Sequence, residues 1–133
     1  MKKVTVAKFF WGVMLFTLGV VTRLAAQTLT DSPQRQEQNR SGLSGAPGRE
    51  VIESIIEYKP GETIDRHFHH DIEAVYVIQG ASAQAPVTIP SGLTQMNLRD
   101  VAHVGAKVVG EAPLKLFTVH IVDKDKPLYE FIK

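Results

Sequence analysis

Residues 61–80, GETIDRHFHHDIEAVYVIQG, decide how the rest of the chain is interpreted. In an extended strand, successive side chains point to opposite faces and advance by about 3.3 Å per residue. His67 and His69 therefore project from the same face, close enough to share one ion. Glu73 follows after a short polar break that permits a turn into a second strand. The stretch predicts a metal site at the mouth of a hairpin.

Short strands separated by turn residues account for the chain after Glu50. β-Branched and apolar runs end at turn signals such as Lys59-Pro60-Gly61 and Pro90-Ser91-Gly92, and no helical periodicity is sustained after Gln27. The pattern predicts an all-β domain over residues 51–133, a small β-sandwich or barrel of six to eight strands. The expected strands are 51–58, 63–69, 73–78, 83–89, 93–98, 101–109, 114–122 and 128–132.

Residues 1–26 have the pattern of a secretory signal peptide. Three lysines precede an apolar run over residues 9–21, and Ala25-Ala26 suits cleavage before Gln27. The run is short for a membrane span, which needs roughly 20 residues. We therefore expect cleaved export, to the periplasm or the exterior, with an uncleaved membrane anchor as the alternative.

Residues 27–50 are polar and rich in Ser, Gly, Gln and Arg. Such a segment buries little apolar surface, so it is predicted to be a flexible or loosely docked arm. Four of the 15 basic residues and none of the 14 acidic ones lie in residues 1–26, so the mature chain is mildly acidic. This composition gives no electrostatic case for nucleic acid or, after cleavage, for a membrane. The chain has no cysteine, which excludes disulfides, thiolate metal sites and a cysteine nucleophile.

His103, on the later predicted strand 101–109, is the obvious fourth ligand if that strand lies beside the hairpin. Three imidazoles and one carboxylate suit a divalent transition-metal ion such as Fe, Mn, Zn, Ni or Cu and are too rich in nitrogen for Ca or Mg. A six-coordinate ion would keep two positions for water, dioxygen or substrate. By the same two-residue period, Val75, Val77 and Gln79 share the face of Glu73, which predicts a largely apolar cavity with one amide.

The stretch resembles the first motif of the cupin superfamily. That motif is a glycine, five residues, His-x-His, three residues, Glu, six residues and a glycine, and all five fixed positions are present: Gly61, His67, His69, Glu73 and Gly80. The second cupin motif is partial. Gly92 and His103 match its spacing, whereas Leu98, Asp100 and Lys107 replace the usual proline, glycine and asparagine.

The resemblance implies a small single-domain cupin, a jelly-roll barrel with its metal inside and often a homodimer. Cupins include enzymes and non-catalytic binders, so the fold does not determine the function. The leading hypothesis is an exported metal-dependent enzyme, with dioxygenase-like or related chemistry, on a small organic molecule. The alternatives are a periplasmic small-molecule or metal-binding module and a structural domain with an inactive site.

No second catalytic residue can be named from the sequence. Glu62, Asp71 and His120 are possible acids or bases. Asp71, like His70, is expected in an exposed turn, and His120 is expected to be a hydrogen-bonded histidine of the barrel.

Overall fold

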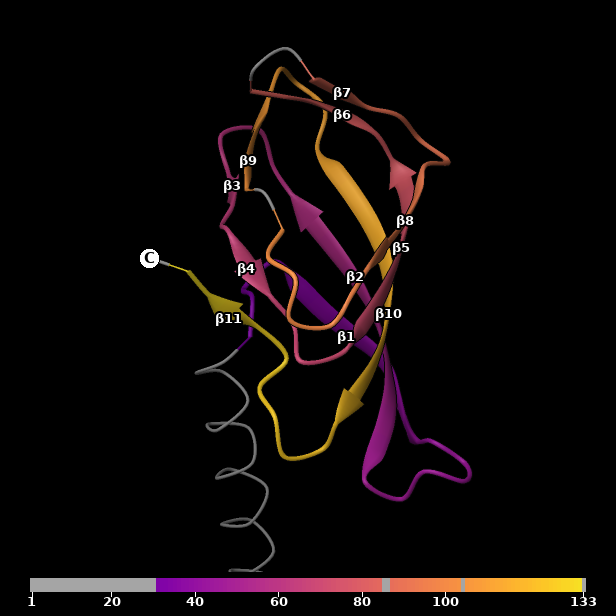
Figure 1. Cartoon of the computed structure of the whole chain (residues 1–133). Helices are drawn as coiled ribbons and strands as arrows, with labels where there is room; N and C mark the ends of the chain where they lie inside the picture. Colours follow the sequence, from indigo (N-terminus) through magenta and orange to yellow (C-terminus); the bar gives the residue numbers. More distant parts are fainter. Residues whose placement is uncertain (1–30, 85–86, 104, 133) are drawn as a thin grey trace, which may run out of the picture. The chain divides into compact units, whose positions relative to one another are not determined.

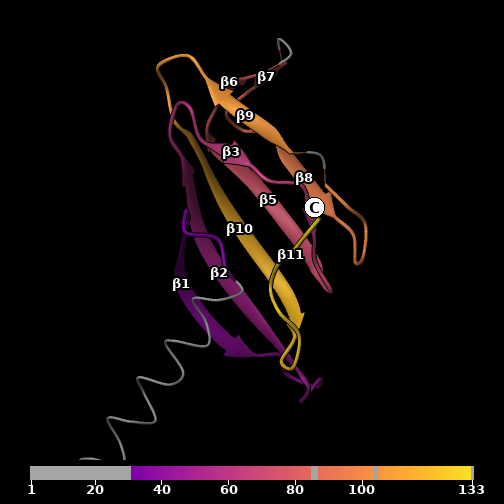
Figure 2. The same cartoon turned by 90° about the vertical axis from the view of Figure 1, so that its left-hand side faces the viewer.

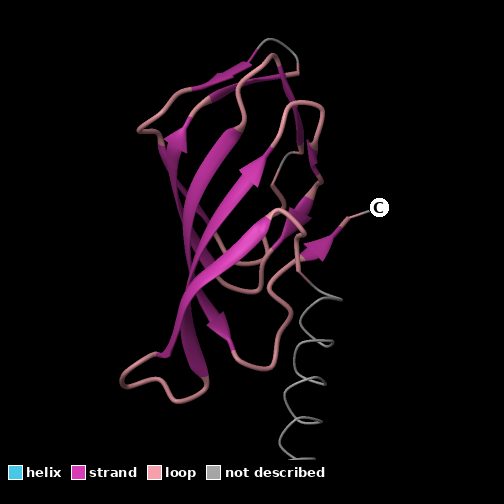
Figure 3. Ribbon diagram, turned by 180° about the vertical axis from the view of Figure 1, so that it is seen from behind, coloured by secondary structure: helices cyan, strands magenta, loops and turns pink. Residues whose placement is uncertain are grey.

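The computed structural model describes residues 31–84, 87–103 and 105–132, and Figure 3 shows them as strands joined by loops. The predicted signal peptide, residues 1–26, lies outside this part of the chain. None of the described residues forms a helix long and apolar enough to cross a membrane.

The main feature is a five-stranded antiparallel sheet with the order β1-β2-β10-β5-β8. Its strands are β1 (Arg35–Gly42), β2 (Arg49–Tyr58), β5 (Ile72–Gln79), β8 (Thr94–Asn97) and β10 (Leu114–Asp123). Opposite it lie a four-stranded sheet, β3-β9-β6-β7, and a two-stranded sheet, β11-β4 (Figures 1 and 2). Their strands are β3 (Thr63–Ile64), β4 (His67–Phe68), β6 (Ala81–Ala83), β7 (Val87–Ile89), β9 (Ala106–Val109) and β11 (Glu130–Phe131).

In β2, β5 and β10 the buried side chains fall at alternate positions, as the two-residue period predicts. In β2 the buried positions are Ile52, Ser54, Ile56 and Tyr58. The compact apolar core is formed by residues of both layers: Ile56, Tyr58, Val77, Ala81, Val108 and Leu114. The prediction of an all-β sandwich is confirmed.

The described residues form eleven strand segments rather than six to eight, because long predicted strands are interrupted. Predicted strand 63–69 divides into β3 and β4, which pair with different partners, β9 and β11. Predicted strand 83–89 is part of a hairpin, in which β6 turns back to pair with β7. Predicted strand 101–109 is regular only over β9, and His103 forms an isolated bridge with His67.

Part of the predicted arm, residues 27–50, is a strand in the region that the structure describes. Arg35–Gly42 form β1, an edge strand that pairs with β2 and carries seven register partners there. Its side chains are mostly exposed, so the strand is held by backbone hydrogen bonds and polar contacts instead of apolar burial. The folded domain therefore includes residues that precede position 51.

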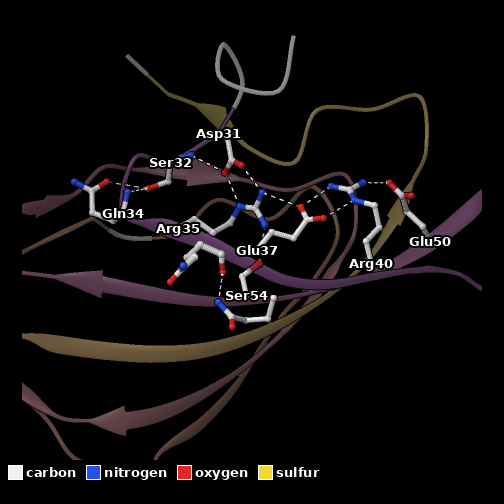
Figure 4. A network of polar contacts seen from close by, with 10 residues as sticks. Asp31, Ser32, Gln34, Arg35, Glu37, Arg40, Glu50 and Ser54 are labelled. Atoms are coloured by element: carbon white, nitrogen blue, oxygen red, sulfur yellow. Dashed lines mark hydrogen bonds and ion pairs between the residues drawn. The ribbon is translucent and has the colours of Figure 1, made fainter. Parts of the chain in front are cut away.

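Figure 4 shows the polar network that attaches β1 to the sheet. The buried guanidinium of Arg35 contacts the carboxylate of Asp31 and donates a 2.6 Å hydrogen bond to Oγ of Ser54, on the inner face of β2. Further along β1, Arg40 contacts Glu37 at 2.7 Å and pairs with Glu50 of β2. Charged hydrogen bonds of this kind are stronger than neutral ones.

Candidate metal centre

The four predicted ligands lie close together between the layers, in two groups of candidate ligands that share His69. His67 lies in β4, His69 directly after it, Glu73 near the start of β5, and His103 in the segment before β9. The ring centroids of His67, His69 and His103 are 4.8 to 5.2 Å apart, and each ring offers a nitrogen within 4.8 Å of the others. Nε2 of His69 lies 3.3 Å from Oε2 of Glu73.

The turn that precedes His103 keeps its shape despite its altered sequence. Asp100 occupies the position where the second motif usually has glycine, and its φ of 59° lies in the left-handed region that glycine favours. Aspartate tolerates this region better than most residues. The amide of Asp100 donates to the carbonyl of His69, and the amide of His103 donates to the carbonyl of His67. These two bonds hold the His103 segment against the first motif.

Backbone carbonyls orient two of the imidazoles. Nδ1 of His67 lies 2.7 Å from the carbonyl oxygen of Asp65, and Nδ1 of His69 lies 2.7 Å from that of Leu128. A carbonyl oxygen only accepts, so each Nδ1 carries the proton and each neutral ring keeps its lone pair on Nε2. Metal-binding histidines are commonly oriented in this way.

Glu73 is 5% exposed and is held as a carboxylate. Burial by itself would raise its pKa, but the contacts with His69 and His120 and a 2.6 Å hydrogen bond from the Asn97 amide outweigh burial and lower the pKa to about 2. Burial lowers the pKa values of His67 and His103. Burial also acts to lower the pKa of His69, but its contact with Glu73 prevails and raises it.

The structure adds His120 and Asp71 to the centre. His120, in β10, is fully buried, and its Nε2 lies 3.4 Å from Oε1 of Glu73. Its Nδ1 lies 2.9 Å from Oδ2 of Asp71. Asp71 is only 2% exposed, so the expectation of an exposed turn residue is wrong, because the turn folds inward against β10. His120 is hydrogen-bonded on one side only, since its Nε2 has no partner.

A cavity of about 340 Å³ lies beside the centre. His67, Glu73 and His103 line one part of it, and the two predicted face residues Val75 and Val77 line another. The rest of the wall is mainly apolar, with polar groups from Tyr58, Thr88, Gln95, Asn97 and Tyr129. The predicted amide, Gln79, is exposed and donates instead to the carbonyl of Pro113.

Tyr129 is a further residue that the sequence did not indicate. Its ring lies 5.2 Å from that of His67 and 4.9 Å from that of His69, between centroids. The hydroxyl is buried without a partner, and burial raises the pKa of Tyr129 well above 10, so the group stays protonated. Glu62, in contrast, accepts from the amide of Lys59 in a turn and does not line the cavity.

The chemistry of this cluster fits a transition-metal ion. Nε2 of His69, His103 and His120 are buried and lack hydrogen-bond partners. Buried polar atoms normally form hydrogen bonds. Several buried nitrogens without a hydrogen-bond partner in one place therefore indicate that a further group binds them. Neutral imidazole nitrogens beside a carboxylate are a usual donor set for Zn, Fe, Mn, Ni or Cu. The described residues could therefore hold one metal ion.

Solved structures share the fold of this chain. The polyketide cyclase RemF from Streptomyces resistomycificus has a TM-score of 0.50 and 19% identity, with 77% of each chain covered. The capsular polysaccharide assembling protein CapF from Staphylococcus aureus has a TM-score of 0.56 and 14% identity over 77% of this chain. A structure of the DMSP lyases RdDddP and RnDddQII has a TM-score of 0.51 and 12% identity over 62% of this chain.

At 12 to 19% identity these likenesses show the fold alone, an all-β jelly roll. This is the fold that the resemblance of the first motif to the cupin superfamily predicts. The chain spans 33% of the length of CapF and 44% of the lyase chain. No protein-family model matches the sequence, and no curated protein matches it.

Proposed function

We propose that this cupin is an exported, metal-dependent enzyme that acts on a small organic molecule. The observation that carries the proposal is the position of a histidine and carboxylate cluster at the wall of an apolar cavity. His67, His69, Glu73 and His103 would hold the ion. When bound, the ion would supply Lewis acidity and exchangeable coordination positions, as dioxygenase-like or related chemistry requires.

The cavity favours a small substrate with a mainly apolar body. About 340 Å³ is at the lower end of the range for ligand pockets. Val75, Val77 and Leu116 would contact the apolar part, while a polar group of the substrate would face Glu73 and the histidines. The buried hydroxyl of Tyr129 would donate a hydrogen bond to that group. Phenols and short organic acids fit this description.

A non-catalytic binding module is the second candidate. It is favoured by the wall of the cavity, where the described residues place no acidic or basic side chain besides the candidate ligands. General acid–base catalysis would then depend on Tyr129 alone or on groups of the substrate. Export and a homodimer stay predictions.

Elemental analysis of the purified protein, followed by assays of the metal-loaded form, tests the proposal. We expect near-stoichiometric transition metal, and conversion of at least one member of a panel of phenols and organic acids, with oxygen uptake as a second signal. A metal-loaded protein that converts nothing, yet is stabilised against heat by one of these compounds, would support the binding module. Absence of metal even after reconstitution would contradict the metal-dependent enzyme and favour the binding module or a structural domain.

Metal occupancy should fall as the pH falls below about 6, because a proton and the metal compete for the same Nε2 lone pairs. The lowered pKa values of His67 and His103 keep these rings neutral, and so able to bind, to lower pH than an exposed histidine. The raised pKa of His69 means that, in the metal-free protein, this ring takes up a proton at a higher pH than His67 and His103. Dialysis over a pH series with metal analysis measures this, and full occupancy at pH 4 would contradict histidine ligation.

A further inference from the structure

The pairing of two long strands brings His120 into the candidate metal centre. β10 and β5 are antiparallel neighbours in which His120 is the register partner of Glu73. Both side chains are buried and reach the same space, with His120 Nε2 3.4 Å from Glu73 Oε1. The ring centroids of His120 and His69 are 4.9 Å apart. His69, Glu73 and His120 each offer a donor atom within 4.8 Å of the others.

Asp71 determines which nitrogen of His120 is available. A carboxylate accepts, so the 2.9 Å contact with Asp71 places the proton of the neutral ring on Nδ1. The lone pair is then on Nε2, which is buried without a hydrogen-bond partner. A histidine with a purely structural role would be expected to satisfy both nitrogens at such a fully buried position. A carboxylate behind a histidine is a common support for a metal ligand.

The separations within the group of His69, Glu73 and His120 agree with ligation of one ion, and His67 and His103 form a second group that shares His69. Donor atoms that bind one ion at about 2.1 Å lie about 3 Å apart when they meet it at a right angle and about 3.4 Å apart at the tetrahedral angle. The measured separations from Glu73 are 3.3 Å to Nε2 of His69 and 3.4 Å to Nε2 of His120. Both are close to these values, and each involves a different oxygen of the carboxylate.

We propose that His120 is a fifth protein ligand, held by Asp71, to the ion that His67, His69, Glu73 and His103 bind. This inference rests on the proposed metal centre and changes its chemistry. A six-coordinate ion with five protein ligands keeps one exchangeable position instead of two. An external ligand would then bind through a single atom.

The test is long-range ¹H–¹⁵N NMR of the purified full chain, labelled with ¹⁵N at histidine, before and after addition of Zn²⁺. The chain has five histidines, and His70 is a built-in control because both of its nitrogens contact surface carboxylates, those of Asp100 and Glu130. We expect Nε2 of four histidines to move to metal-bound shifts and His70 to keep its own. This measurement needs no substitution, so it does not depend on a variant that folds.

Substitutions provide the second readout. His120→Gln should remove one of the four shifted signals and raise the Kd for Zn²⁺ by about 10- to 100-fold. Asp71→Asn should weaken the binding of Zn²⁺ by a similar factor, because loss of a supporting carboxylate has this effect at other metal sites. Thr118→Val is the matched control, because Thr118 is also fully buried on the inner face of β10 and offers no imidazole or carboxylate.

Three shifted histidines in the Zn²⁺-loaded chain, with His120 unchanged, would overturn this inference and leave the four-ligand centre intact. An unchanged Kd in a folded His120→Gln variant would do the same. Failure of the chain to bind Zn²⁺ at all would overturn both the inference and the proposed function.

Discussion

Replacing His69 with alanine should abolish metal retention while the neighbouring substitution His70→Ala leaves it intact. Protein sites bind Zn²⁺ with about 10–16 kcal/mol shared among about four ligands, so one ligand contributes roughly 2.5–4 kcal/mol, or about 10²- to 10³-fold in Kd. His69 is 1% exposed and occurs in both groups of candidate ligands. His70 is adjacent in sequence but contacts Asp100 and Glu130 outside the cluster.

The measurement is metal content after dialysis, together with melting curves with and without a chelator. A ligand at 100 times its Kd stabilises the folded state by about 2.7 kcal/mol. For a domain of about 100 residues, this corresponds to a melting temperature roughly 11–22 °C higher. The chelator should therefore lower the melting temperature of the wild-type chain and of His70→Ala but not that of His69→Ala. Equal metal content in the two variants would contradict the assignment.

The substitution Gly80→Ala should be among the most destabilising single changes in the domain. A Cβ atom at position 80 would lie 2.1 Å from the carbonyl oxygen of Ile89 and 2.7 Å from the amide nitrogen of Ser91. Both are backbone atoms at the end of β7 and just after it, so the hairpin has to move to relieve the overlap. Over-packing of this kind costs about 3 kcal/mol at the upper end of its usual range. This predicts a melting temperature lower by about 12–24 °C.

Gly48→Ala is the control for this effect. A Cβ at Gly48 meets no atom within 4 Å, and its backbone is not in the left-handed region, so the same methyl group should be tolerated. Thermal unfolding of the metal-free proteins measures both variants and separates the packing effect from metal binding. Equal melting temperatures for the two variants would show that the close approach at Gly80 does not constrain the fold.

The last glycine of the motif therefore has a packing explanation, which the spacing of the motif alone does not supply. Gly61, at the start of the motif, has a different reason, because its φ of 92° suits glycine. Asp100 shows the reverse situation. Its sequence departs from the second motif, but the chain keeps the left-handed conformation there, and His103 reaches its place.

The sequence by itself determined the all-β class and the part of the metal centre that lies within residues 67–73. The period of two sets the shared face of His67 and His69, and a short break brings in Glu73, because these contacts depend only on neighbouring residues.

Tertiary structure alone decided the rest of the centre and the strand β1. Asp71 and His120 are 49 positions apart and meet only through the register of β5 and β10. Strand β1 has no apolar alternation, and its backbone hydrogen bonds to β2 and the contacts of Arg35 make it a strand. Pairing between distant strands leaves no period in the local sequence, so neither feature could be predicted from it.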